Sequence, residues 1–228
     1  SVNDAIPKML LDQNGFTSML SKVREVARIL NPYKEAVLFL GLSGLRVEEA
    51  LNCIRTFHEK GPENYLNKEL SVLEHYKFPK TFIRKTKRAY ITVVDDYMLG
   101  LLENAKPISY DRLRSHFRRK SRSKCYFHLF RKVWATFMRR HAIEPEIIDL
   151  FQGRMPKTVF IRYYYRPNLG SLICKVRARL MDLRRIFQMR KPFASKKKGK
   201  LIWFMVDVQV FWMSFFTFLF SKVAFVHF

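Results

Sequence analysis

Apolar residues recur at intervals of three and four along the first third of the chain. In residues 15–30 this spacing predicts an amphipathic helix, which Asn31 and Pro32 end. A second helical region is predicted over residues 33–57, with a break at the glycines of the sequence GLSG, residues 41–44. The N-terminal part is therefore expected to be mainly helical.

Residues 81–94 have a different pattern. β-Branched and aromatic residues stand on both sides of the short polar run Lys85-Thr86-Lys87, which predicts a β-hairpin. The preceding stretch 61–67, GPENYLN, is interpreted as a loop.

Helical spacing returns in the C-terminal half. Residues 125–153 predict two helices, separated near Pro145 and ended at Gly153. A long basic helix follows, with an apolar stripe of Leu172, Val176, Leu180, Leu183 and Phe187.

The composition changes after residue 190. Residues 191–200, KPFASKKKGK, predict a basic linker between a domain over residues 1–190 and an apolar tail over residues 201–228. The tail is long enough to cross a bilayer, but Asp207 interrupts it. A membrane segment and an accidental read-through of a split gene are equally compatible with it.

The net charge narrows the possible partners. Lys and Arg number 43 against 19 Asp and Glu, a formal charge of +24, which indicates binding to a polyanion and argues against an ordinary enzyme of small metabolites. The three cysteines are far apart and have no metal-ligand spacing, so neither a zinc site nor a disulfide framework is expected. Without a signal-peptide pattern at the first residues, an intracellular location is expected.

Several residues could act on a phosphate group. Arg46 and Arg131 both interrupt apolar helical patterns, and an arginine there needs a partner. His128 lies three residues before Arg131 and so shares its helix face. The tyrosines at 163–165 supply phenols that could serve as nucleophiles.

The order of these motifs resembles the tyrosine recombinase (phage integrase) family. GLSGLRVEEALN (41–52) is similar to the first box of that family, and HLFRKVWATFM (128–138) to the second. The stretch from FQGR (151–154) to YYYRP (163–167) is similar to the tyrosine-bearing segment, above all in integrases of archaeal viruses and plasmids. The resemblance implies a catalytic domain that is mainly α-helical with a small antiparallel β-sheet (α+β).

The resemblance also implies an activity. Such enzymes are site-specific recombinases that cut and rejoin DNA through a 3′-phosphotyrosine intermediate, without a metal or other cofactor. Residues matched to the family's catalytic positions are Arg46, Lys87, His128, Arg131, Arg154 and Tyr164. Lys85 and Tyr163 remain alternatives for the lysine and the nucleophile. Arg154 stands where the family usually has His or Trp, so it either contacts phosphate or is only a charge at a helix C-terminus.

The implied partner is double-stranded DNA, bound by a homo-oligomer, expected to be a tetramer on paired sites. Candidate phosphate contacts are Arg112, Arg114, Arg118, Arg119, Lys120, Arg122 and Lys124. The amphipathic helix from Leu172 either packs on its own domain or passes to a neighbouring subunit. The family's upstream DNA-clamping domain has no counterpart here and is expected to be missing.

Other functions stay open on the sequence alone. A catalytically inactive, DNA-binding remnant of a disrupted integrase gene is the main alternative. A basic membrane-associated protein is another. A metal-dependent nuclease would have to use Asp95 and Asp96, which as neighbours on a strand would point to opposite faces.

Overall fold

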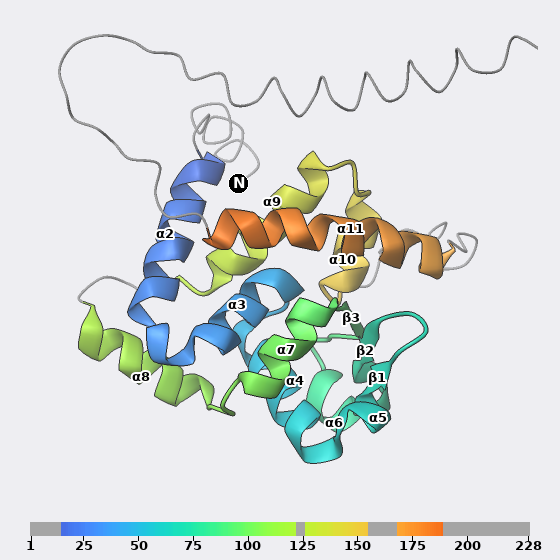
Figure 1. Cartoon of the computed structure of the whole chain (residues 1–228), viewed down its shortest axis with the longest axis horizontal. Coiled ribbons are helices and arrows are strands. Elements are labelled where there is room, and N and C mark those ends of the chain that lie inside the picture. The colour runs from blue at the N-terminus through green and yellow to red at the C-terminus, as the bar shows by residue number, and fades with distance from the viewer. Residues whose placement is uncertain (1–14, 122–125, 155–167, 189–228) are drawn as a thin grey trace, which may run out of the picture. The chain divides into compact units, whose positions relative to one another are not determined.

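A computed structural model of the chain describes residues 15–121, 126–154 and 168–188. These residues form helices around one small sheet (Figure 1). The helices are α2 (Gly15–Ile29), α3 (Lys34–Ser43), α4 (Val47–Lys60), α5 (Pro62–Tyr65), α6 (Pro79–Phe82), α7 (Asp96–Asn104), α8 (Tyr110–Lys120), α9 (His128–Arg140), α10 (Pro145–Phe151) and α11 (Leu169–Gln188), with 3-10 turns η1 (Asn31–Tyr33) and η2 (His75–Lys77). The expected α+β class with a small antiparallel sheet is confirmed.

Helix α3 lies at the centre of the described fold. Eight of its ten residues are buried, because it is apolar on every side. It contacts α2, α4, α7, α9 and α11, which surround it (Figure 1). The core therefore forms around one helix, and the helices that carry the candidate site residues, α4 and α9, both pack on it.

The sheet has three antiparallel strands in the order β1 (Leu66–Asn67), β2 (Val72–Glu74), β3 (Ile91–Val93). Leu73 pairs with Leu66 on one side and with Thr92 on the other. Two sequence predictions were wrong here. Residues 61–67 form α5 and β1 instead of a loop, and β3 pairs with β2 instead of with the segment before Lys85.

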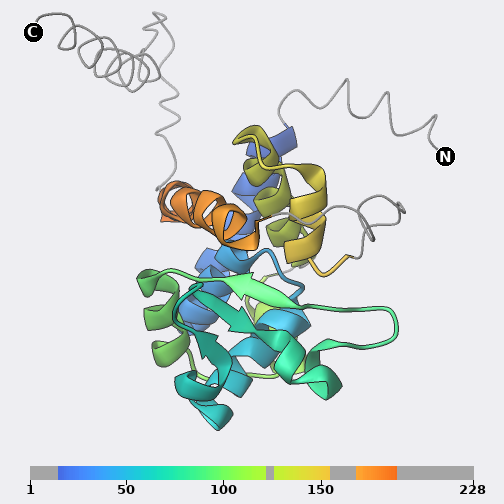
Figure 2. The same cartoon turned by 90° about the vertical axis from the view of Figure 1, so that its right-hand side faces the viewer.

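The predicted hairpin is reduced to a turn with a single bridge. Residues 79–82 are helical, and an isolated β-bridge pairs Ile83 with Arg88 across the turn. The backbone N–H of Arg84 donates to the carbonyl of Lys87 (3.0 Å). We call residues 84–87 the lysine turn; it projects between α6 and β3 (Figure 2).

Helix α11 packs on its own domain, one of the two alternatives left open by the sequence. It contacts α3, α9 and β3. Its buried residues are Leu172, Ile173, Val176, Leu180 and Leu183. Arg24 of α2 donates to the carbonyl of Ile186 (3.0 Å from Nε), which ties the end of α11 to the first described helix.

Candidate active site

Arg46 is presented by a sharp break between two helices. Helix α3 ends at Ser43, and Gly44 has a φ of +68°. A Cβ on Gly44 would lie 2.5 Å from the ring of Trp134 in α9, so both the backbone angle and the space require glycine. Arg46 then occupies the N-cap of α4, as the predicted break near GLSG suggested.

The partner of Arg46 is the buried carboxylate of Glu49. Arg46 Nη1 donates to Glu49 Oε1 (2.6 Å), and the Arg46 backbone N–H donates to Oε2 (3.0 Å). The side chain of Glu49 is 1% exposed and that of Arg46 is 30% exposed. Arg46, which interrupts an apolar pattern in the sequence, thus has the partner that such an arginine needs, and the group buried at the start of α4 is the acid.

Arg131 reaches the same carboxylate from α9. Its Nη1 lies 4.0 Å from Glu49 Oε2, and its side chain is 11% exposed. Arg131 Nη2 donates to the carbonyl of Gln152 (2.7 Å), and Gln152 Nε2 donates back to the carbonyl of Arg131 (3.1 Å). Burial, with the nearby charge of Arg46, lowers the pKa of Arg131 to about 10.

The lysine turn is held beside these arginines. The carbonyl of Arg88 accepts from Arg46 Nη1 (3.4 Å). Gly153, with a φ of +69°, lies against the same carbonyl: a Cβ there would be 1.8 Å from the oxygen. Lys87 Nζ lies 3.6 Å from Oε2 of Glu48, in the first turn of α4. Lys85 is exposed and forms no ion pair or hydrogen bond with the described residues.

His128 and Arg154 lie at the edge of this arrangement. His128 is the first residue of α9 and is largely exposed. The partial burial of its ring and the charge of Lys132 lower its pKa. Within the described part of the chain, its ring forms no hydrogen bond with Arg46 or Arg131. Arg154 follows α10, donates to Asp149 Oδ1 (2.9 Å) and contributes positive charge near Arg131. Both interpretations of Arg154, phosphate contact and helix-end charge, fit this position.

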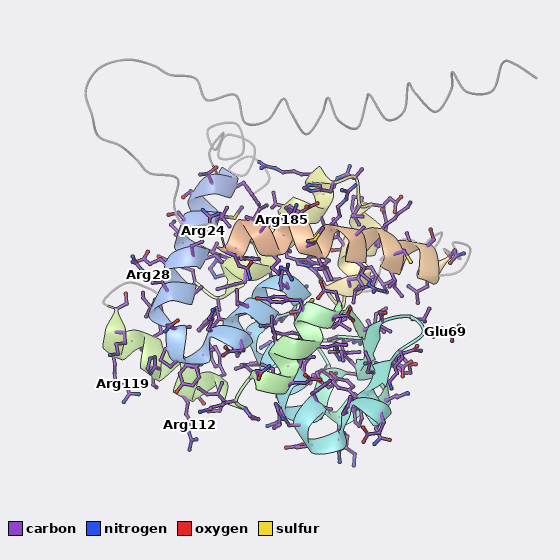
Figure 3. All side chains as sticks on the ribbon, in the orientation of Figure 1. Arg24, Arg28, Glu69, Arg112, Arg119 and Arg185 are labelled. Atoms are coloured by element: carbon purple, nitrogen blue, oxygen red, sulfur yellow. The ribbon has the colours of Figure 1, made fainter. Side chains whose placement is uncertain are left out.

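The two candidate nucleophiles, Tyr163 and Tyr164, lie outside the described residues, as do Arg122 and Lys124. The remaining candidate DNA contacts are on α8. Leu113 and Phe117 of that helix face the core, which leaves Arg112, Arg114, Arg118, Arg119 and Lys120 exposed. Figure 3 shows Arg112 and Arg119 pointing away from the body of the protein.

A groove of about 410 Å³ connects α4 with the start of α8. Its lining includes Glu48, Asn52, Arg55, Ile108 and Arg112. Glu48 thus stands between the lysine turn on one side and a groove with two arginines on the other. Arg55 of α4 and Arg112 of α8 consequently line one groove.

In residues 15–121, 126–154 and 168–188, no cluster of three or more His, Cys, Asp or Glu side chains could bind a metal ion. Asp95 caps α7 instead, accepting from the backbone N–H of Met98 (2.8 Å). Asp96 is the first residue of that helix. The two residues are thus at a helix start and not on a strand.

Sequence reasoning missed Glu49, Gln152 and Gly153 as parts of the site. A local signal existed for Glu49, since an acid three residues after an N-cap commonly bonds back to the cap. The partnership of Gln152 with Arg131 spans 21 residues and has no local signal.

The comparison with protein families agrees with the motif order. The archaeal phage integrase family matches residues 16–169. The chain therefore belongs to the archaeal phage integrase family. No curated protein and no solved structure matches the sequence. Among the helices of the described residues, none has the length and apolar character needed to span a membrane.

Proposed function

We propose that the protein is a site-specific DNA recombinase that cuts and rejoins strands through a 3′-phosphotyrosine link. A tyrosine hydroxyl attacks the scissile phosphorus, the P–O bond to the 5′-oxygen breaks, and that oxygen leaves as a hydroxyl after taking a proton. Attack by a 5′-hydroxyl on the phosphotyrosine reverses the step. The covalent link conserves the bond energy, so the reaction consumes neither ATP nor another co-reactant.

The observation that carries the proposal is the convergence of Arg46 and Arg131 on Glu49. The acid hydrogen-bonds Arg46 and lies 4.0 Å from Arg131, and its single negative charge neutralises only one of the two positive charges. Arg131 Nη1 is buried and has no hydrogen-bond partner among the described residues. A phosphate oxygen would satisfy that nitrogen and the remaining charge, and guanidinium matches phosphate geometry.

The proposed roles follow from charge. Arg46 and Arg131 would bind the non-bridging oxygens, whose charge grows in the transition state. Removing such a donor costs about 3–4 kcal/mol of barrier. Lys87, the lysine that lies near the start of α4, would protonate the leaving 5′-oxygen, and His128 and Arg154 would assist at the edge. Tyr164 is the proposed nucleophile, with Tyr163 as the alternative.

The exposed cations of α8 and the groove beside Glu48 are the proposed path of the DNA backbone. Phosphate contacts of this kind position the duplex without reading its sequence. A homo-tetramer would pair two DNA sites and exchange their strands.

The test is formation of a covalent protein–DNA adduct. The substrate is a pool of nicked duplexes with a randomised core, in which the nick lets the cut fragment diffuse away and traps the adduct. The reaction runs in EDTA, and adducts are separated in detergent and sequenced to give the site. An adduct formed by the wild type and lost in Tyr164→Phe, but kept in Tyr165→Phe, supports the proposal.

Each alternative has its own outcome. Loss of the adduct in Tyr163→Phe and not in Tyr164→Phe transfers the nucleophile to the neighbouring residue. DNA binding without any adduct supports the inactive remnant. Cleavage that requires a divalent metal and leaves no adduct supports a nuclease.

A further inference from the structure

Glu48 is an acid that the proposed reaction does not use, although it lies among its cations. Its Oε2 accepts from Arg84 Nη1 (3.0 Å) and lies 3.6 Å from Lys87 Nζ. Arg84 and Lys87 are the two ends of the lysine turn, and Glu48 belongs to the first turn of α4, two residues after Arg46. One carboxylate therefore joins the turn to the helix that presents Arg46.

The pair with Arg84 is more than a loose surface contact. The Arg84 side chain is 39% and that of Glu48 is 36% exposed. Two other nitrogens of Arg84, Nε and Nη2, are buried and lack a hydrogen-bond partner among the described residues. Glu48 is thus the group that compensates a half-buried guanidinium, and Arg84, with Lys87 behind it, lowers the pKa of that carboxyl.

The lysine turn has a second attachment at its other side. There the carbonyl of Arg88 meets Arg46 and Gly153. Between the two attachments, Lys85 and Thr86 form an exposed tip. Without Glu48 the turn would still be attached through Arg88, but the Arg84 side chain and the Lys87 ammonium would lose the carboxylate that holds them beside α4.

We propose that Glu48 is a positioning residue, which through its ion pair with Arg84 holds the lysine turn so that Lys87 faces the phosphate site. This inference rests on the proposed function. The shorter bond, to Arg84, anchors the turn. The longer contact, to Lys87, leaves that ammonium free to turn toward the leaving oxygen of a bound DNA strand.

The test compares Glu48→Gln with the wild type on two substrates. The first is the nicked duplex recovered from the adduct selection. The second is the same duplex with sulfur in place of the bridging 5′-oxygen; a thiolate leaves without being protonated, so this substrate needs no general acid. The rate of adduct formation is measured at saturating DNA, which separates the chemical step from binding.

Displacing the general acid should lower the rate of adduct formation only with the oxygen substrate. Glu48→Gln is expected to form adduct roughly 10- to 100-fold more slowly with oxygen, since about 1 Å of misplacement has an effect of this size. With sulfur its rate should stay within about twofold of the wild type. Lys87→Ala should give the same pattern with a larger loss.

Asp182→Asn is the matched control. Asp182 is 38% exposed, is paired with Arg185 (3.4 Å) on α11, and its loss changes the net charge equally. It should leave both rates unchanged. Equal slowing of Glu48→Gln on both substrates, or no slowing on either, overturns the role of Glu48. Absence of any wild-type adduct on either substrate overturns the proposed function itself.

Discussion

Glu49 is the residue on which the arrangement of Arg46 and Arg131 depends. It accepts from Arg46 twice and faces Arg131 while being almost fully removed from solvent. Burying the Glu49 carboxylate costs free energy, which the two neighbouring cations offset. The carboxylate in turn offsets the cost of burying Arg131. The three residues therefore form one unit in which no member can be replaced without cost to the others.

Replacing Glu49 with glutamine should destabilise the folded protein by about 3 kcal/mol, because Arg131 would remain buried without a counter-charge. The measurement is the free energy of unfolding in urea. Glu59→Gln, on the same helix, is the control: Glu59 is 59% exposed and 4.0 Å from Arg55, so little change is expected. Equal stability of Glu49→Gln and the wild type would show that the buried acid does not hold the arginines.

Most of the long helices could be predicted at the scale of elements, because a periodic pattern over three or more turns is unambiguous. Most of the short ones could not: β1 has two residues, β2 has three, and α5 and α6 have four each; β3, with three, lay in a predicted strand, but its pairing partner was not predicted. No full period fits in such lengths, so tertiary pairing decides their structure. The fold class, and Arg46 and Arg131 as candidate site residues, could be predicted from the sequence. The local signal for their carboxylate partner, Glu49, was overlooked, and the strand order has no signal in the sequence.

The contact of Gly153 with Arg88 links α10 to the lysine turn. Gly153→Ala should lower the free energy of unfolding by about 1–3 kcal/mol, the cost of a left-handed angle with a side chain. The Cβ should also push Arg88 away and slow adduct formation. Gly100→Ala is the control, since nothing lies within 4 Å of a Cβ in that helix, and it should stabilise by about 0.5–1 kcal/mol. Equal adduct rates for Gly153→Ala and the wild type would contradict this link.

A buried polar network joins α4, α5, η2 and β3. The His75 ring bonds to the hydroxyl of Tyr65 through Nδ1 (2.5 Å) and to that of Thr92 through Nε2 (2.7 Å), with Cys53 Sγ 3.8 Å from Nε2. Burial lowers the pKa of His75 from 6.5 to about 3. The folded protein therefore keeps this ring neutral at a pH where the unfolded chain protonates it.

This difference in the pKa of His75 should make the folded protein less stable at acid pH. Above pH 6.5 the ring is neutral in both states and the full stability is present. Below it the unfolded state alone gains a proton, so stability should fall by about 1.4 kcal/mol per pH unit down to the folded pKa. Urea unfolding at pH 7, 6 and 5 measures the slope, which should flatten in His75→Gln. An identical slope in that variant would assign the loss to other groups.

Within a molecule of net charge +24, helix α8 carries five exposed cations and one acid, Asp111, so it can be tested as a DNA-binding surface. Neutralising Arg112, Arg118 and Arg119 to Gln should weaken DNA binding and reduce the dependence of log Kd on log salt by roughly 0.9 for each phosphate that the variant no longer binds. Fluorescence anisotropy with a labelled duplex at several salt concentrations measures both.

A control must separate the effect of lost net charge from the effect of losing cations on α8. A variant with Lys60, Lys68 and Lys80 changed to Gln loses the same charge from exposed positions outside α8. It should keep the wild-type salt slope. The same reduction in both variants would mean that DNA is attracted by net charge and not bound along α8.

We propose that Arg131, held between Glu49 and Gln152, stabilises the phosphate during strand cleavage. The most direct measurement is the rate of adduct formation in EDTA by the wild type and by Arg131→Ala, each first shown to be folded by circular dichroism. The wild type should form the adduct roughly 100- to 1000-fold faster than the variant. An Arg131→Ala protein that forms the adduct at the wild-type rate would contradict it.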